Sequence, residues 1–240
     1  MSKRTLCNTN DPKEMDMWIK IAKAALKSSS YNANSGIATS FYFDFDESIL
    51  GRRTAEGLFK VNATEIDEIQ KKITKYISEL ENKLSLTFDN IAFIDKGNVG
   101  PVGIIGLMAL VAISLKDKNC LIVRPRKRLI NASVKGNFKK GNNVLILTDV
   151  VTSGSTIYQA ANKIWQLGGS VPCALAWLDR NLGASENLAQ YGVNLYSIVG
   201  PKDLSNTWTD LKKTLQKDKQ KECFIDFGSY SSTSVWPSLN

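Results

Sequence analysis

The 240-residue sequence contains no histidine. Without an imidazole, the protein cannot use histidine as a general base, a proton shuttle or a metal ligand, which excludes histidine-dependent catalysis and His-ligated metal centres. The four cysteines, Cys7, Cys120, Cys173 and Cys223, are far apart and form no CxxC pair. This spacing argues against a zinc site and a disulfide framework, and it predicts reduced thiols in a cytoplasmic protein.

Long apolar runs are missing as well. The longest, at residues 104–115, has about a dozen residues and includes Gly106 and Ser114, which is short for a membrane span and suits a buried helix. The beginning of the chain, MSKRTLCNTNDPKEM, is polar throughout and does not resemble a signal peptide. We therefore expect no membrane association.

Positive charge exceeds negative charge, with 31 Lys and Arg against 23 Asp and Glu and a net charge of +8. Such a balance suits a polyanionic partner, either a pyrophosphate-containing substrate or nucleic acid. Many of the lysines fall on the polar faces of expected helices, so a solvated surface is an alternative explanation of the excess. With 43% hydrophobic and 22% charged residues, the composition is that of a globular protein and not of a disordered one.

Strands and helices are expected to alternate through the middle of the chain. An apolar stripe at helical spacing predicts an amphipathic helix at residues 64–80. A buried strand at 90–94, a helix at 102–115 and a strand at 119–123 then form a βαβ unit, which implies a parallel sheet with a right-handed crossover. Further apolar runs predict three more strands, at 144–147, 171–178 and 194–199.

Residues 144–156, which read VLILTDVVTSGST, are the most informative stretch of the chain. An apolar strand runs into Asp149, a short polar turn follows, and apolar residues at helical spacing come after the turn. A helix N-terminus presents backbone N–H groups to an anion, and a carboxylate at a strand end can accept hydrogen bonds from sugar hydroxyls. The segment therefore predicts a sugar-phosphate cradle, with an ordinary strand-to-helix turn capped by small polar residues as the alternative.

The same segment resembles the 5-phosphoribosyl-1-pyrophosphate (PRPP) motif of type I phosphoribosyltransferases, and most closely that of the orotate branch. This branch often reads EDVVTSG where the chain reads TDVVTSG, so Thr148 replaces the first of two carboxylates. The resemblance implies that Thr148 and Asp149 both belong to the PRPP site, that Asp149 holds the ribose hydroxyls and is a candidate contact for magnesium, and that the missing carboxylate at Thr148 removes one contact to the ribose or its magnesium. The residues implied to hold the 5-phosphate are Thr152, Ser153, Gly154, Ser155 and Thr156.

Lys96-Gly97 is expected to lie in the loop after the strand at 90–94, at the carboxyl end of the strand, where parallel sheets bind their ligands. Lys96 offers a cation and Gly97 a permissive backbone position to a pyrophosphate. The pair resembles the YKG loop that some orotate phosphoribosyltransferases have at this place for the pyrophosphate. The resemblance therefore implies PRPP binding by both residues.

A basic run, RPRKR, follows the strand at 119–123. It resembles the start of the orotate family's flexible catalytic loop, RKxxKxHGxG. Arg124 aligns with the arginine of that loop and Arg128 with its second lysine, whereas Pro125 replaces the first lysine and Ile130 the histidine. A solvated turn and a nucleic-acid patch are the other interpretations, and residues 129–142 are expected to continue as a loop.

Two further stretches resemble base-binding parts of the orotate family. Leu178-Asp179-Arg180 matches an LDR stretch whose arginine pairs with the orotate carboxylate, and a guanidinium suits a planar carboxylate bidentately; a salt-bridged turn is the alternative. Near the start of the chain, Phe41 and Tyr42 lie in a stretch similar to the family's SGRxSPYYFD hood over the base, with Ile37 and Ser40 where Arg and Pro are usual. Core or hairpin packing is the alternative for these aromatic residues.

These observations predict an α/β protein with the parallel-sheet, Rossmann-like phosphoribosyltransferase fold and an N-terminal hood. We expect a single domain, with residues 1–60 as the hood or arm, 61–200 as the PRPP-binding core and 201–240 as a C-terminal helix and tail. The resemblance implies an enzyme of pyrimidine biosynthesis that transfers the phosphoribosyl group of PRPP to orotate, giving orotidine 5′-monophosphate and pyrophosphate. Its candidate catalytic residues are Asp149, Arg124 and Arg128.

The resemblance further implies Mg²⁺ bound through PRPP and a homodimer. Two alternatives stay open. One is a phosphoribosyltransferase for another nucleobase, and the other is a non-catalytic regulator that senses PRPP or binds nucleic acid.

Overall fold

The computed structural model describes most of the chain between residues 63 and 200 and a few segments before it. Backbone and side chains are described for residues 13, 16–18, 66–95, 111, 114, 115, 117–124 and 134–200, and the backbone alone for 26–32, 38–43, 52–54, 57–59 and 63–65. The expected C-terminal helix and tail, and most of the helix expected at 102–115, lie outside these ranges.

A six-stranded sheet forms the centre of the fold, with the strand order β10-β9-β8-β5-β6-β7. Five strands run parallel, and β7 runs antiparallel to β6 at one edge. This arrangement confirms the predicted α/β fold with a mostly parallel sheet. The strands are β5 (Asn90–Ile94), β6 (Asn119–Val123), β7 (Val134–Gly136), β8 (Asn143–Val151), β9 (Ser170–Asp179) and β10 (Asn194–Val199).

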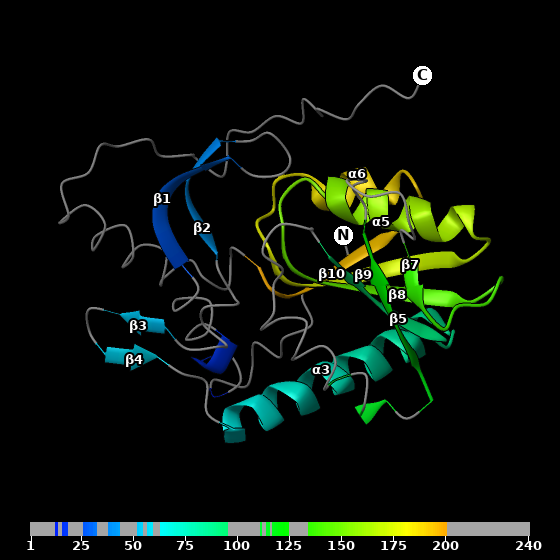
Figure 1. Ribbon diagram of the computed structural model, residues 1–240, viewed down its shortest axis with the longest axis horizontal. Helices are drawn as coiled ribbons and strands as arrows, with labels where there is room; N and C mark the ends of the chain where they lie inside the picture. The colour runs from blue at the N-terminus through cyan, green and yellow to red at the C-terminus, as the bar shows by residue number, and fades with distance from the viewer. Residues whose placement is uncertain are drawn as a thin grey trace.

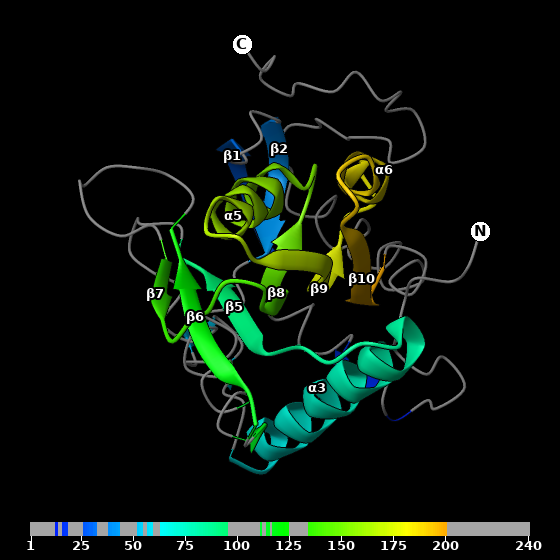
Figure 2. The same ribbon diagram turned by 90° about the vertical axis from the view of Figure 1, so that its right-hand side faces the viewer.

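Helices cover both faces of the sheet: α3 (Ala63–Leu84) lies on one face, and α5 (Ser155–Gln166) and α6 (Ala184–Ala189) lie on the other (Figures 1 and 2). Within β8, Leu145 and Leu147 belong to the apolar cluster that includes α3, whereas Val144 and Ile146 belong to the cluster that includes α5. Successive side chains of a strand point to opposite faces, so a strand covered on both sides needs a continuous apolar run.

The predicted amphipathic stripe holds α3 against the sheet. Each buried side chain of the size of Ile or Leu contributes about 1.5–3 kcal/mol relative to an exposed one. The Lys71–Asp67 ion pair on the outer face of the helix is solvent-exposed and adds little. The buried residues of the stripe are Ile69, Ile73, Tyr76, Ile77 and Leu80.

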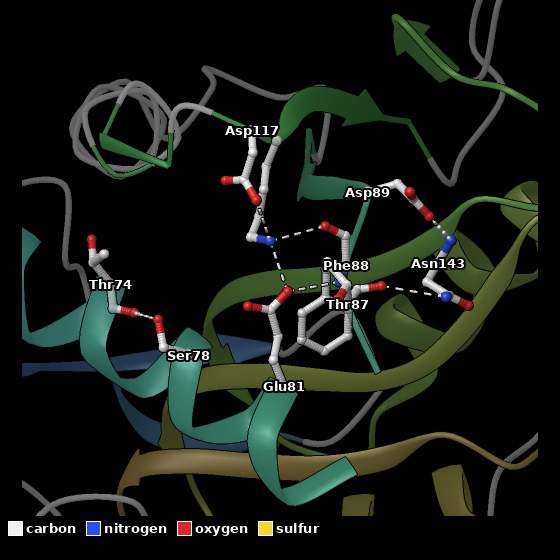
Figure 3. Close-up of polar contacts among 9 residues, drawn as sticks. Thr74, Ser78, Glu81, Thr87, Phe88, Asp89, Asp117 and Asn143 are labelled. Carbon is white, nitrogen blue, oxygen red and sulfur yellow. Dashed lines mark hydrogen bonds and ion pairs between the residues drawn. The ribbon is translucent and has the colours of Figure 1, made fainter. Parts of the chain in front are cut away.

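A polar cluster at the amino-terminal edge of the sheet ties α3 to the starts of the strands (Figure 3). The Nζ atom of Lys118, whose side chain is only 3% exposed, lies 2.7 Å from Oε1 of Glu81 and donates to the carbonyl oxygen of Phe88 at 3.1 Å. The same Glu81 oxygen accepts the N–H of Phe88 at 2.8 Å. Nearby, the Asp89 carboxylate accepts the N–H of Asn143 at 2.7 Å. These bonds fix the starts of β5, β6 and β8 relative to one another.

The N-terminal region contains two antiparallel hairpins. β1 (Leu26–Asn32) pairs with β2 (Ala38–Phe43), and β3 (Arg52–Thr54) pairs with β4 (Gly57–Phe59). The predicted hood segment therefore contains strands. The division of the chain into hood, core and tail stays a prediction.

The strand β7 corrects the expectation that residues 129–142 form a loop. Its Val134, Lys135 and Gly136 pair with β6, and the last two of these are exposed. No apolar alternation marks such a strand in the sequence. Its strand geometry comes from pairing with the edge of the sheet, which is a tertiary effect.

In the part of the chain that the structure describes, no helix has both the length and the apolar character needed to cross a membrane. The described cysteines, Cys120 and Cys173, have free thiols. Burial of Cys173 raises the pKa of its thiol well above the usual value. Cys7 and Cys223 lie outside the described residues, and the cytoplasmic location stays a prediction.

Candidate functional site

The strand order has a topological switch point between β5 and β8. From β5 the chain passes to β6 on one side, and it later returns to β8 on the other side of β5 before continuing to β9 and β10. The chain therefore continues to opposite sides of this point after β5 and after β8. Open α/β sheets bind their ligands at such a switch point, outside the carboxyl ends of the strands.

Several of the predicted site residues follow strand ends at this edge. The register pairs Val151 of β8 with Asp179 of β9, so Thr152 and Arg180 leave the sheet at the same level. In the same way Ile94 of β5 lies opposite Val123 of β6, so that Arg124 follows β6 at the level where β5 ends. The fold thus brings the polar loop after β8, Arg180 and Arg124 to one edge.

Thr152, Ser153 and Gly154 connect β8 to α5, whose first residue is Ser155. The first hydrogen bond of this helix runs from the N–H of Tyr158 to the carbonyl of Gly154 at 2.9 Å. The backbone amides of the first helical turn have no partner within the helix and point toward its N-terminal end, where the helix dipole is positive; the N–H of Ser155 donates to Oγ of Ser153 at 3.5 Å. The first turn of α5 contains no acidic side chain. This geometry suits an anion.

Gly154 is required by the shape of the loop. Its φ of 83° lies in the left-handed region that favours glycine. A Cβ atom added there would lie 2.9 Å from Cγ and 3.1 Å from Cδ1 of Leu188, and 3.4 Å from the carbonyl oxygen of Ala184. The loop therefore packs directly on α6, which leaves no room for a side chain.

Asp149 lies inside β8, two positions before the strand ends at Val151, because the strand extends beyond the predicted apolar run at 144–147. Thr148, which is 8% exposed, donates from its Oγ1 to Oδ1 of Asp149 at 3.1 Å. The hydroxyl at the position of the missing carboxylate therefore supports the remaining one. Asp149 itself is half-buried.

Arg180 is buried, with 5% of its surface exposed, although it follows a strand end. Its backbone N–H donates to the carbonyl of Val151 at 3.0 Å, which ties it to the residue before the polar loop. Burial lowers the pKa of its guanidinium from the usual value, because a charged group loses solvation there. In the turn that follows, the Asp179 carboxylate accepts the N–H of Asn181 at 2.8 Å. A buried guanidinium of this kind strongly favours an anionic partner.

Arg124 forms an ion pair that the sequence did not reveal. Its Nε lies 2.7 Å from Oδ2 of Asp95, and the two side chains are 45% and 14% exposed. The N–H of Asp95 also donates to the carbonyl of Val123 at 2.8 Å. Arg124 is therefore held against Asp95, the residue that precedes the predicted Lys-Gly pair.

Of the remaining predicted residues, some are not described by the structure and others have only their backbone described. Lys96, Gly97 and Arg128 lie outside the described residues. Phe41 and Tyr42 lie in β2, where they pair with Ser28 and Lys27 of β1, and their backbone alone is described. Their contact with a base stays a prediction.

Sequence reasoning also missed Asn187 of α6, whose Nδ2 donates to the carbonyl oxygen of Ser153 at 3.0 Å. The two residues are 34 positions apart in the chain. The one sequence signal is that Asn187 comes shortly after the predicted LDR turn. For Asp95, the signal is a carboxylate directly before the predicted Lys-Gly pair.

No group of three or more Asp, Glu or Cys side chains that could hold a metal ion is found among the described residues. No direct metal ligand was predicted from the sequence, and Asp149 is the candidate contact for magnesium bound through PRPP. One carboxylate together with substrate phosphates and water is a ligand set that Mg²⁺ accepts.

No protein-family model matches the chain, but individual proteins and solved structures are similar to it. The orotate phosphoribosyltransferase of Pyrococcus abyssi is 33% identical over 137 residues, which are 56% of this chain and 71% of that protein. Among solved structures, the orotate phosphoribosyltransferase of Aeropyrum pernix has a TM-score of 0.55 at 22% identity, with 79% of this chain and 98% of that one covered. The orotate phosphoribosyltransferase of Mycobacterium tuberculosis, solved in complex with PRPP, has a TM-score of 0.51 at 17% identity and covers 81% of this chain and 92% of its own. The chain belongs to the orotate phosphoribosyltransferase family.

Proposed function

We propose that the protein transfers the 5-phosphoribosyl group of PRPP to orotate, giving orotidine 5′-monophosphate and pyrophosphate. The observation that carries this proposal is the arrangement of the residues that follow the paired ends of β8 and β9. The polar loop Thr152–Gly154, at the start of α5, and the buried Arg180 leave neighbouring strands at the same level and are joined by the bond from the Arg180 N–H to the Val151 carbonyl. A loop suited to an anion and a cation suited to a carboxylate therefore follow neighbouring strand ends.

The 5-phosphate of PRPP would occupy the loop and the first turn of α5. The five residues assigned to it supply hydroxyls and backbone amides: Thr152, Ser153, Gly154, Ser155 and Thr156. Asp149 would accept hydrogen bonds from the ribose hydroxyls, and the Thr148 hydroxyl keeps that carboxylate oriented. Such an arrangement fixes the sugar before the reaction, which is where much of the rate advantage of an oriented substrate arises.

The pyrophosphate would leave on the side of β5 and β6. The bond between C1 of the ribose and the pyrophosphate oxygen breaks, a bond from a ring nitrogen of the base to C1 forms, and the proton that this nitrogen carries passes to the departing pyrophosphate or to water. Lys96, Gly97, Arg124 and Arg128 are the groups we assign to the leaving pyrophosphate, where cations stabilise the negative charge that develops. Magnesium held by PRPP, with Asp149 as the carboxylate in reach, would supply further charge neutralisation.

Arg180 is the residue that we assign to the base. A guanidinium can bind both oxygens of the orotate carboxylate, and its burial keeps water from competing. Uracil lacks this carboxylate, so Arg180 would select orotate. Phe41 and Tyr42 would cover the base from the hood, and a homodimer stays a prediction of the family resemblance.

Two alternatives rest on the basic loop, in which Pro125 and Ile130 replace residues usual in the family. A phosphoribosyltransferase for another nucleobase would turn over PRPP with that base and not with orotate. A regulator would bind PRPP or nucleic acid without turnover, and its nucleic-acid binding would weaken steeply with salt.

The test is the loss of orotate absorbance in the presence of Mg²⁺ and PRPP, measured for the wild type and for Arg180→Lys. The wild type should consume orotate. Arg180→Lys keeps the charge but loses the bidentate fork, so the KM for orotate should rise about tenfold to a hundredfold, as expected when a charge-assisted hydrogen bond is lost, while the KM for PRPP stays the same. Turnover of another base but not of orotate, or an unchanged KM for orotate in the variant, would contradict the proposal.

A further inference from the structure

Asn187 contacts the polar loop Thr152–Gly154, and this contact has so far been given no function. It lies in α6, and its side-chain amide donates from Nδ2 to the carbonyl oxygen of Ser153 at 3.0 Å. Leu188, the next residue, packs against Gly154. Two neighbouring residues of α6 therefore touch two neighbouring residues of the loop.

The hydrogen bond from Asn187 sets the orientation of one peptide unit. In a trans peptide the C=O and the following N–H point in opposite directions, and the described residues contain no cis peptide bond. Because the carbonyl of Ser153 faces Asn187, the N–H of Gly154 points away from α6. A flipped peptide would instead place a carbonyl oxygen where an anion is to bind.

The same helix is anchored to the turn that carries Arg180. Asn181 and Gly183 both have positive φ, 55° and 86°, and form the tight turn between Arg180 and α6. The N–H of Asn187 donates to the carbonyl of Gly183 at 3.0 Å. Arg180 and the loop are thus connected twice: directly, through the carbonyl of Val151, and indirectly, through α6 and Asn187.

We propose that Asn187 is a positioning residue of the phosphate-binding loop, which holds the Ser153–Gly154 peptide with its N–H directed to the 5-phosphate of PRPP. This inference rests on the proposed function for the identity of the anion. Asn187 does not contact the substrate. It acts through the peptide that it orients, so its loss should weaken PRPP binding more than orotate binding.

The test compares Asn187→Ala and Asn187→Leu with a matched pair at Asn194. Asn194 also donates from Nδ2 to a backbone carbonyl, that of Pro172 at 3.4 Å, and this bond is also partly buried. Asn194 is the first residue of β10, so it lies at the amino-terminal ends of the parallel strands, away from the polar loop at their carboxyl ends. Alanine removes the amide, and leucine removes it while keeping the size of the side chain without adding charge.

Both Asn187 variants should raise the KM for PRPP about tenfold, as expected for one lost hydrogen bond, and leave the KM for orotate unchanged. Both Asn194 variants should leave both KM values unchanged, even where they lower the melting temperature. An unchanged KM for PRPP in Asn187→Ala, or an equal rise in the Asn194 variants, would overturn the inference.

The thermal shift caused by PRPP separates this inference from the proposed function. If the wild type does not turn over orotate but PRPP still raises its melting temperature, the function is wrong, and the inference holds only if both Asn187 variants lose most of that shift. If PRPP does not protect the wild type at all, both are wrong.

Discussion

Replacing Gly154 by alanine tests how tightly the loop is packed on α6. The left-handed φ of 83° costs an alanine about 1–2 kcal/mol. Its Cβ would lie 2.9 Å from Cγ of Leu188, and forcing an extra methyl group into a packed site costs about 1–3 kcal/mol more. We therefore expect Gly154→Ala to lower the free energy of unfolding by about 2–5 kcal/mol. For a chain of this size, each kcal/mol corresponds to about 2–4 °C in melting temperature.

Gly192→Ala is the matched control. Gly192 also has a positive φ, 75°, but nothing lies within 4 Å of the position of its Cβ. It should therefore show the backbone cost of about 1–2 kcal/mol and no packing cost. The excess cost of Gly154→Ala over this control measures the contact with Leu188.

Urea unfolding of both variants, with Leu188→Ala alone and combined with Gly154→Ala, completes the measurement. Truncation of Leu188 makes room for the new methyl group, so the two changes should cost less together than the sum of their separate costs. If Gly154→Ala is no worse than Gly192→Ala, or if the two changes add without coupling, the packing argument is refuted.

Two further predictions concern the core. Breaking the buried Lys118–Glu81 pair by Glu81→Leu should lower the free energy of urea unfolding by about 3 kcal/mol, because the Lys118 ammonium stays buried without its main partner. The control Glu79→Ala, which breaks an exposed pair with Lys75, should lower it by less than about 0.5 kcal/mol. Equal losses would contradict the role of the buried pair. Burial raises the pKa of the Cys173 thiol above its usual 9.0. At a pH above 9 the unfolded state therefore releases a proton that the folded state keeps, so the free energy of unfolding is unaffected by this thiol below pH 9 and falls as the pH rises further. Unfolding measured between pH 8 and about 10 should therefore show a steeper loss of stability in the wild type than in Cys173→Ala, and parallel curves would refute this.

The centre of the fold could be predicted from the sequence because its signals are local. The apolar run before Asp149, the small polar residues after it and the helical spacing beyond place β8, the loop and α5 without any tertiary information. Arg180 was found differently, from the resemblance of Leu178-Asp179-Arg180 to the LDR stretch of the orotate family, since a strand-end Asp-Arg pair by itself also fits a salt-bridged turn. Parallel strands then bring these ends together, since their carboxyl ends share one edge of the sheet.

The parts that could not be predicted depend on contacts between distant residues. The strand β7 exists because it pairs with β6, and α6 has only six residues, too few for a clear helical period. The ion pair of Arg124 with Asp95 joins residues 29 positions apart, and the bond from Asn187 to Ser153 joins residues 34 apart. Neither pair leaves a pattern in one sequence, because any polar side chain at a loop has many equivalent partners.

The central claim, that the junction of β8 and α5 binds the ribose 5-phosphate part of PRPP, is tested most directly by calorimetric titration of PRPP and Mg²⁺ into the wild type and into Asp149→Asn. The substitution keeps the shape of the side chain but removes the charge that would accept hydrogen bonds from the ribose hydroxyls. We expect the wild type to bind PRPP and the variant to bind it about tenfold to a hundredfold more weakly, as for the loss of a charge-assisted hydrogen bond. Equal affinity in the two proteins, or no binding by the wild type, would contradict the account.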